Sequence, residues 1–432
     1  MSTQTEAESD NGGNSAAEIL ADLGSSQGER EELYKWFHQH PELSLSECET
    51  SQRIVDTLSG YGLSPKRVGD TGVVAVIANG EGPVVAMRAD IDALPVREAS
   101  GKDYAPTATT EDESGETVPV AHACGHDVHI VSLLGACQAM AAHTDKWSGT
   151  FVAVFQPAEE TAEGADALVA AGIAEEIPTP DVYFGQHVLS SLPGGHVGTQ
   201  VGPSFSTSER IQVTVHGHGT HGAMAYLGVD PVVLASSIVM RLQTIVSREI
   251  DSAQQASVTV GALRAGSRAN IIADSAELLI DTRAYSTDVQ KQIREAIERI
   301  VRAECDASKS PKEPEFEYYE HYPITDNDAD VTDRVHAAFD AYFGEKSGEL
   351  GRVPASEDFS IVPDSLGVPY TYWGLGGFAD TSHAVGNHDP AFAPDIWPTL
   401  DRGAEAIVVA ACAWLAWDPS ATGVGSSALR GR

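Results

Sequence analysis

The chain is poor in cysteine and lysine and has no long apolar run, and each shortage excludes a class of protein. Its 432 residues include five cysteines, too few for a disulfide framework. No segment approaches the ~20 uninterrupted apolar residues of a membrane span. Residues 1–18 contain neither a basic nor an apolar region, so a secretory signal peptide is not expected. These absences predict a protein of the cytoplasm that does not enter a membrane.

Positive charge is scarce as well. The chain has 27 Lys and Arg residues, only eight of them Lys, against 63 Asp and Glu, for a formal net charge of −36. Nucleic acids and anionic membranes are therefore not expected as partners, because both bind clusters of Lys and Arg. Such a charge destabilises a compact chain by self-repulsion unless salt screens it. The composition therefore predicts a halophilic, salt-adapted protein.

Strands and helices alternate along the first half of the chain, which predicts an α/β domain with a largely parallel sheet. Helical spacing runs from 16 to 58 with a break at Pro41, and residues 98–118 form an acidic loop. Further helices are expected at 126–143 and 164–176. The expected strands are 73–80, 83–96, 149–160 and 181–188.

The middle of the chain has a different pattern, β-α-β-β-α-β, which is typical of a ferredoxin-like α+β unit. Its expected strands are 210–217, 256–263, 275–285 and 313–323, and its helices are 230–249 and 289–305. We therefore predict one catalytic domain interrupted by a smaller inserted domain. The predicted segments are a disordered acidic tail (1–15), the catalytic domain in two parts (16–203 and 322–417), the inserted domain (204–321) and a flexible tail (418–432).

The densest group of possible metal ligands is HACGHDVH at 122–129, which follows a loop and opens a predicted helix. Cys124 and His126 lie two residues apart and can reach one ion from an irregular turn. A thiolate with an imidazole suits Zn²⁺ and similar metals. A single histidine is more often structural than a metal ligand. The prediction of a metal site therefore depends on how closely the possible ligands are grouped.

Three other segments place further ligands at the ends of apolar strands or in a late loop: Glu159 and Glu160, His187, and His388. Ligands of open α/β sheets gather at the carboxyl edge of the strands. Together with Cys124 and His126 these side chains exceed what one tetrahedral ion needs. The pattern indicates two metal ions that share a bridging ligand. The alternative for Glu159 and Glu160 is a solvated helix N-terminus.

The motifs MRADIDALPV, HACGHDVH, FQPAEE, GQHV, GHGTHGA, RANIIAD, SEDFS and NHDP occur in this order between residues 28 and 415. In this the chain resembles the metal-dependent amidohydrolases of the aminoacylase, hippurate hydrolase and auxin-conjugate hydrolase group, within the dinuclear zinc peptidases and deacylases. The resemblance implies a zinc-peptidase-like catalytic domain with an inserted ferredoxin-like lid and dimerisation domain. It also implies hydrolysis of N-acyl amino acids by a metal-activated water.

The resemblance also implies roles for individual residues. Cys124 bridges two divalent metals (Zn or Mn, with Co also suitable), and Glu159 is the general base. His126 and His187 hold one metal, and Glu160 and His388 hold the other. Asp90 and Asp92 support the ligands from behind. In the inserted domain the residues that bind the substrate carboxylate or the oxyanion are His221, Asn270 and Arg283.

The resemblance further implies a homodimer formed through the inserted domain, in which His221 acts on its own or on the partner's site. Helix 230–249 presents Val233, Ser237, Met240 and Ile245 for such pairing. Two other activities stay open: a carboxypeptidase or N-carbamoyl-amino-acid hydrolase on the same metal site, and a non-catalytic metal-binding module. Retention of Glu159 beside the ligands disfavours the second.

Overall fold

The computed structural model describes residues 10–112 and 114–416, so the predicted tail at 418–432 and most of the one at 1–15 lie outside the described residues. The chain divides into two compact units. Unit 1 comprises 1–202, 327–351 and 359–432, and unit 2 comprises 203–326 and 352–358. Each unit has its own apolar core. No helix in the part of the chain that the structure describes is long and apolar enough to cross a bilayer.

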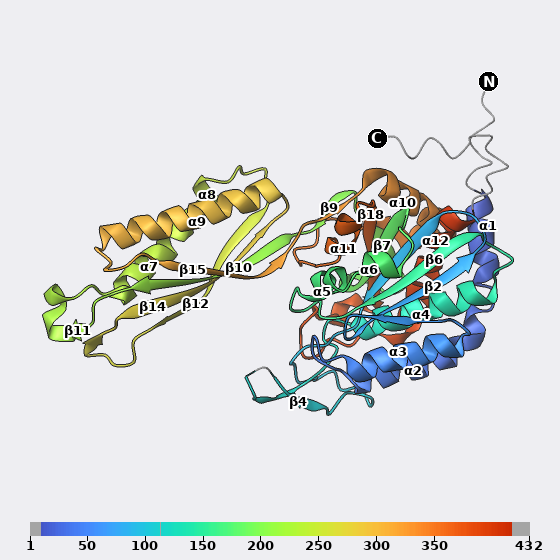
Figure 1. The fold of residues 1–432 in the computed structure, drawn as a ribbon, viewed down its shortest axis with the longest axis horizontal. Coiled ribbons are helices and arrows are strands. Elements are labelled where there is room, and N and C mark those ends of the chain that lie inside the picture. The colour runs from blue at the N-terminus through green and yellow to red at the C-terminus, as the bar shows by residue number, and fades with distance from the viewer. Residues whose placement is uncertain (1–9, 113, 417–432) are drawn as a thin grey trace, which may run out of the picture. The chain divides into compact units, whose positions relative to one another are not determined.

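Unit 1 is built from one large sheet with helices packed on it (Figure 1). Its strands are β1 (Lys66–Val68), β2 (Gly72–Asn79), β3 (Val84–Asp90), β4 (Thr109–Glu111), β5 (Thr117–Pro119), β6 (Gly149–Gln156), β7 (Val182–Pro193), β8 (Val197–Thr199), β17 (Ser347–Glu349) and β18 (Tyr370–Phe378). Its helices are α1 (Asp10–Ile19), η1 (Leu23–Ser26), α2 (Gln27–Gln39), α3 (Cys48–Gly60), α4 (His126–Ala142), α5 (Gly164–Ala170), α6 (Ile173–Glu176), α10 (Ala329–Phe343), η3 (Gly344–Lys346), α11 (Ile361–Leu366), η4 (Thr381–His383) and α12 (Ile396–Leu415).

The strand order of the large sheet is β1-β2-β6-β3-β7-β18-β8-β17. The central strands β6, β3, β7 and β18 are parallel, whereas β1, β2 and β6 pair antiparallel, as do β18 and β8. The predicted parallel pairing is therefore present at the centre of the sheet and in its edge pair β8–β17, whereas the remaining pairs are antiparallel. One reason is local: the link between β1 and β2 is too short for the crossover that parallel strands require.

The central strands are buried on both faces, as parallel strands usually are. On β3, Val85, Met87 and Ala89 join the main core, to which α4 and α12 also contribute. The alternate residues Ala86 and Arg88 are equally buried outside that core. Helix α4 is inaccessible over most of its length, and its first turn packs beside the end of β3 and the middle of β7.

Unit 2 is a four-stranded antiparallel sheet with two longer helices (Figure 1). Its strands are β9 (Gly202–Phe205), β10 (Thr207–His216), β11 (Thr220–His221), β12 (Ala256–Ala265), β13 (Ile271–Ile272), β14 (Ser275–Ala284), β15 (Glu315–Tyr322) and β16 (Thr325–Asn327). Its helices are η2 (Gly222–Leu227), α7 (Pro231–Leu242), α8 (Thr244–Arg248) and α9 (Thr287–Ala307). The strand order β12-β14-β10-β15 is that of a ferredoxin-like unit. The predicted fold class is confirmed.

Several elements differ from the sequence-based expectations. Helix α1 begins at Asp10, inside the predicted tail, and Ala16 and Ile19 anchor it in the core. The predicted loop 98–118 contains the hairpin β4–β5. The predicted helix 230–249 is split at Gln243 into α7 and α8. Ile245 is buried in the core of unit 2 rather than exposed beside Val233 and Met240, because it follows Ile238 and Leu242 at helical spacing on the buried face.

Candidate metal centre

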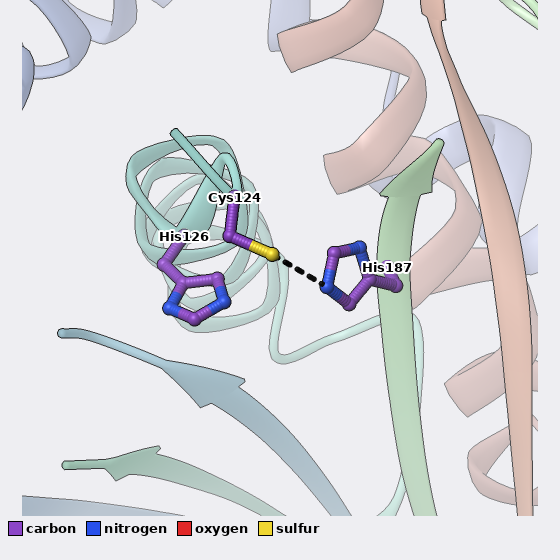
Figure 2. Close-up of side chains that lie close together, drawn as sticks. All are labelled: Cys124, His126 and His187. Carbon is purple, nitrogen blue, oxygen red and sulfur yellow. Dashed lines mark hydrogen bonds between the residues drawn. The ribbon is translucent and has the colours of Figure 1, made fainter. Parts of the chain in front are cut away.

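Three of the predicted ligands converge at the first turn of α4. Cys124 precedes the helix, His126 opens it, and His187 lies on β7 (Figure 2). Their ligand atoms all lie within 4.8 Å of one another, and Cys124 Sγ is 3.5 Å from His187 Nε2. The intervening Gly125 has φ +86°, and a Cβ there would lie 2.5 Å from Val188 Cγ1. The turn that presents Cys124 and His126 therefore requires glycine.

A second set of ligand atoms, from Cys124, Glu160 and His388, also fits within 4.8 Å. Glu160 Oε2 lies 3.3 Å from His388 Nε2, and the His388 side chain is 55% exposed. His388 has φ +71°, and its N–H donates to the carbonyl of Ala123 at 2.8 Å. Both sets contain Cys124, so the arrangement of donors fits two cations with one shared thiolate.

Buried atoms without a partner give an independent test of that fit. His126 Nδ1 donates to Asp92, at 3.0 Å from both its backbone oxygen and Oδ1. Its Nε2 lies 3.8 Å from Glu160 Oε1, and neither atom has a hydrogen-bond partner among residues 10–112 and 114–416. Buried polar atoms are nearly always satisfied. A cation at the first set of ligand atoms would satisfy His126 Nε2, and a cation at the second set would satisfy Glu160 Oε1.

The buried acidic groups of the site also favour the binding of cations. Burial, Glu160 and Glu159 raise the pKa of the Cys124 thiol well above its ordinary value. Burial opposes a charge on His126, but the carboxylates of Asp90, Asp92 and Glu160 raise its pKa to about 10. Bringing a thiolate among these carboxylates is unfavourable unless metal charge compensates it.

Asp90, Asp92 and His129 lie beside the predicted ligands and contact one another or those ligands. Asp92 Oδ1 accepts from His126, and its Oδ2 accepts from the N–H of Glu160 at 2.9 Å. His129 Nδ1 contacts Asp90 Oδ1 at 2.5 Å, and its Nε2 accepts from the N–H of Val188 at 2.8 Å. Asp90, His126 and His129 also lie within ligand distance of one another. Because both ring nitrogens of His129 are hydrogen-bonded, this third group is an orienting network rather than a metal site.

Asn387 is a supporting residue that the sequence reasoning missed. Its side-chain amide donates to the carbonyls of Cys124 and Val188, at 3.1 and 3.2 Å, and lies 3.8 Å from Cys124 Sγ. It therefore ties the late loop that carries His388 to the two earlier ligand segments. Its place in the motif NHDP, directly before His388, was the available signal.

A buried charge cluster lies behind the first turn of α4. His38 on α2 contacts Asp127 Oδ2 through Nδ1 at 2.6 Å and Glu98 Oε2 through Nε2 at 3.0 Å. All three side chains are at most 2% exposed. Burial opposes the imidazolium, but Asp127 and Glu98 raise the pKa of His38 from 6.5 to about 9.

This raised pKa predicts that the cluster contributes less to the free energy of unfolding at alkaline pH. A group whose pKa is raised by folding contributes fully below its unfolded value and loses that contribution as the pH rises through its folded value. The free energy of unfolding of the wild type should therefore exceed that of His38→Gln most near pH 6, and the gap should narrow between about pH 6.5 and 9. Urea unfolding from pH 6 to 10 checks this, with the exposed His40→Gln as control. A gap independent of pH would contradict a charged His38.

The predicted substrate residues lie in unit 2 and are not all together. His221 and Asn270 are neighbours, because the N–H of Gly222 donates to the Asn270 carbonyl and β11 pairs with β13. Both side chains are exposed. Arg283 pairs with Ser208 at the opposite end of β10. Its guanidinium contacts Asp281 Oδ2 at 3.1 Å and donates to the carbonyl of Pro354 at 3.0 Å.

The chain is similar to known proteins over most of its length. The family model of peptidase family M20/M25/M40 matches residues 86–411. The chain is 32% identical over 376 residues to an N-acetylcysteine deacetylase of Bacillus subtilis, covering 86% of this chain and 91% of that protein. It is also 32% identical over 370 residues to thermostable carboxypeptidase 2 of Saccharolobus solfataricus, covering 84% and 90%.

A solved structure is similar over nearly its whole length. The Bacillus subtilis YXEP protein, described as a dinuclear metal binding peptidase from the M20 family, aligns with a TM-score of 0.74 and 26% identity. The alignment covers 90% of this chain and 98% of that one.

Proposed function

The chain belongs to peptidase family M20/M25/M40, and on that premise we propose that it is a metal-dependent amidohydrolase that cleaves N-acyl amino acids into a carboxylic acid and a free amino acid. One observation carries the proposal: two sets of ligand atoms share Cys124, and Glu159 lies beside them. The similarity to an N-acetylcysteine deacetylase supports this substrate class.

The residues of the centre divide between two cations. His126 and His187 would hold one, Glu160 and His388 would hold the other, and Cys124 would be a ligand of both. Zn²⁺ and Mn²⁺ both suit this mixture of sulfur, nitrogen and oxygen donors, as does Co²⁺. When bound, such ions lower the pKa of a water to about 7 and polarise the carbonyl of the amide.

Glu159 is the general base of this proposal. Its side chain is nearly buried, with Oε2 3.9 Å from His126 Nε2. It accepts a proton as water attacks the amide carbonyl and returns that proton to the leaving amine. In unit 2, His221 and Asn270 can donate hydrogen bonds to a developing oxyanion. In this proposal Arg283 binds the substrate carboxylate, in addition to its contacts with Asp281 and Pro354.

A panel of substrates tests the proposal. Release of free amino acid should be fastest from N-acetyl and N-benzoyl amino acids and should disappear after chelation. The similarity to a carboxypeptidase makes dipeptides with a free amino group the competing substrates. Faster hydrolysis of dipeptides or of N-carbamoyl amino acids would replace the acyl-substrate proposal. No hydrolysis by the metal-loaded protein would leave a binding module.

We further propose a homodimer formed through unit 2. Helix α7 exposes three large apolar side chains to solvent: Val232 (42%), Val233 (61%) and Met240 (72%). Beside this helix, β12 is an edge strand of its sheet, and its Leu263 is 39% exposed. An apolar helix face next to an open strand edge is suited to pairing with its copy across a two-fold axis.

Subunit exchange tests both the dimer and the role of His221. If His221 acts on the partner's site, mixing the inactive variants His221→Ala and Glu159→Gln should restore activity, because one site of each heterodimer regains both residues. Native mass spectrometry confirms that exchange has occurred. Mixed dimers without activity would place His221 in its own subunit's site, and a fully active His221→Ala would place it outside catalysis. A monomer at all concentrations would contradict the dimer.

We also propose that the enzyme works in a cytoplasm of high salt. Its net charge of −36 makes self-repulsion the main expected weakness of the fold at low ionic strength. The melting temperature should therefore rise as KCl increases to about 1 M, where the Debye length is only ~3 Å. A melting temperature that is highest in dilute buffer would contradict salt adaptation.

A further inference from the structure

The turn that carries Glu159 and Glu160 has an unfavourable backbone conformation. Ala158 and Ala162 have φ of +49° and +58°, in the left-handed region that residues with a Cβ rarely adopt. The turn closes through hydrogen bonds from the N–H groups of Glu163 and Gly164 to the Ala158 carbonyl. Such a conformation persists only where its surroundings hold it in place.

A buried carboxylate with no part in the proposed chemistry contacts this turn. Glu47, at the start of α3, is inaccessible to solvent. Its Oε1 accepts from the N–H of Ala158 at 2.8 Å and from the N–H of Leu45 at 3.0 Å. Its Oε2 accepts from the hydroxyl of Thr71 at 2.9 Å. The side chain thus joins three chain segments.

The other side of the turn is held in the same manner. Asp92 Oδ2 accepts from the N–H of Glu160 at 2.9 Å and from the Ser44 hydroxyl at 2.7 Å. Glu159 therefore lies between two backbone amides, each bound by a buried carboxylate. Glu47 and Ser44 belong to one short connection, residues 40–47, between α2 and α3.

We propose that Glu47 is a positioning residue of the hydrolase, which fixes the Ala158 amide and thereby the place of Glu159. It acts through the backbone and touches neither substrate nor metal. What matters is an acceptor oxygen at the correct reach, not a negative charge. The inference rests on the proposed function for its kinetic consequence only, because the anchoring of the turn is a property of the fold.

Two substitutions separate reach from charge. Glu47→Gln keeps the length and an acceptor oxygen for Ala158 and removes the charge, and its amide group can still donate to Thr71. Glu47→Asp keeps the charge but is one methylene too short to reach Ala158 from the same backbone. Glu47→Ala removes both properties. Thr71→Val is the matched control, because it removes the partner of Oε2 and leaves the bond to Ala158 intact.

Hydrogen–deuterium exchange of peptides covering 157–164, measured on the metal-loaded enzyme, reports the anchoring without reference to activity. Exchange there should be about tenfold faster in Glu47→Asp and Glu47→Ala than in the wild type, and within about twofold of it in Glu47→Gln and Thr71→Val. Glu47→Asp carries the comparison with Glu47→Gln if Glu47→Ala does not fold.

Kinetics gives the second readout. In Glu47→Asp, kcat should fall by about 10- to 100-fold, since small misplacements of a reacting group can cost that much. KM should stay within about twofold, and two metals should remain bound. Unchanged exchange and kcat in Glu47→Asp, or a greater loss in Glu47→Gln than in Glu47→Asp, would overturn the proposal. A wild type without hydrolase activity would instead refute the proposed function, and the exchange result would still stand.

Discussion

Glu159→Gln should retain both metal ions and lose about 10²- to 10⁴-fold in kcat, the usual contribution of a general base. The substitution keeps the size of a nearly buried side chain and removes its ability to accept a proton. Metal content measured by mass spectrometry, together with steady-state kinetics, checks both parts. The exposed Glu163→Gln, four residues later in the same turn region, is the control and should behave like the wild type.

The neighbouring carboxylate gives the opposite expectation. Glu160 Oε2 faces His388 at 3.3 Å, and its Oε1 faces His126 at 3.8 Å. Glu160→Gln should therefore lose metal first and activity as a consequence, with partial recovery in excess Zn²⁺ or Mn²⁺. Loss of metal in Glu159→Gln and its retention in Glu160→Gln would show that the two roles are reversed.

Removal of metal should abolish hydrolysis, and Cys124→Ala should lower the affinity of the protein for both metal ions. The thiol belongs to both sets of ligand atoms, so its loss takes a donor from each. Because burial and the carboxylates Glu160 and Glu159 raise its pKa, metal binding must displace its proton, and affinity should fall as the pH falls. Titration of the EDTA-treated protein with Zn²⁺, Mn²⁺ or Co²⁺ measures this.

Cys137→Ala is the matched control for that experiment. Cys137 is a buried thiol on the same helix, α4, and is packed in the apolar core of unit 1. Its removal should change stability and leave metal affinity unaltered. Full activity of the chelated wild type, or tight binding of two metals by Cys124→Ala, would contradict a shared thiolate.

Much of this architecture could be predicted because the relevant signals are local. Apolar runs at 73–80 and 149–160 are long enough to indicate buried strands, and β2 and β6 fall there. The ligand motifs were expected at strand ends or helix starts, so a sheet edge was sufficient to predict that Cys124, His187 and Glu160 meet, although β7 continues past His187 to Pro193. The structure brings these side chains together, and their roles remain proposals.

Other features depend on contacts that no local pattern records. Glu47 and Ala158 are separated by 111 positions in the chain, and their hydrogen bond follows from the packing of α3 and the end of β6. The guanidinium of Arg283 is suited to binding a carboxylate, yet the register of its strand places the residue far from His221. No proline or glycine marks the break between α7 and α8 in the sequence. Tertiary packing decides such positions.

The proposed ligands of the metal centre come from both ends of a very long loop. Cys124 and His388 lie on opposite sides of the whole of unit 2 in the chain order, so a shared cation closes a circle of more than half the residues. A cross-link across such a loop restricts the unfolded chain by an amount on the order of 5 kcal/mol in the chain-entropy model. During synthesis the second ion can bind only after His388 has left the ribosome. Capture of this second ion would therefore be a late event of maturation, and it would join the late segment with His388 to the earlier segment with Cys124.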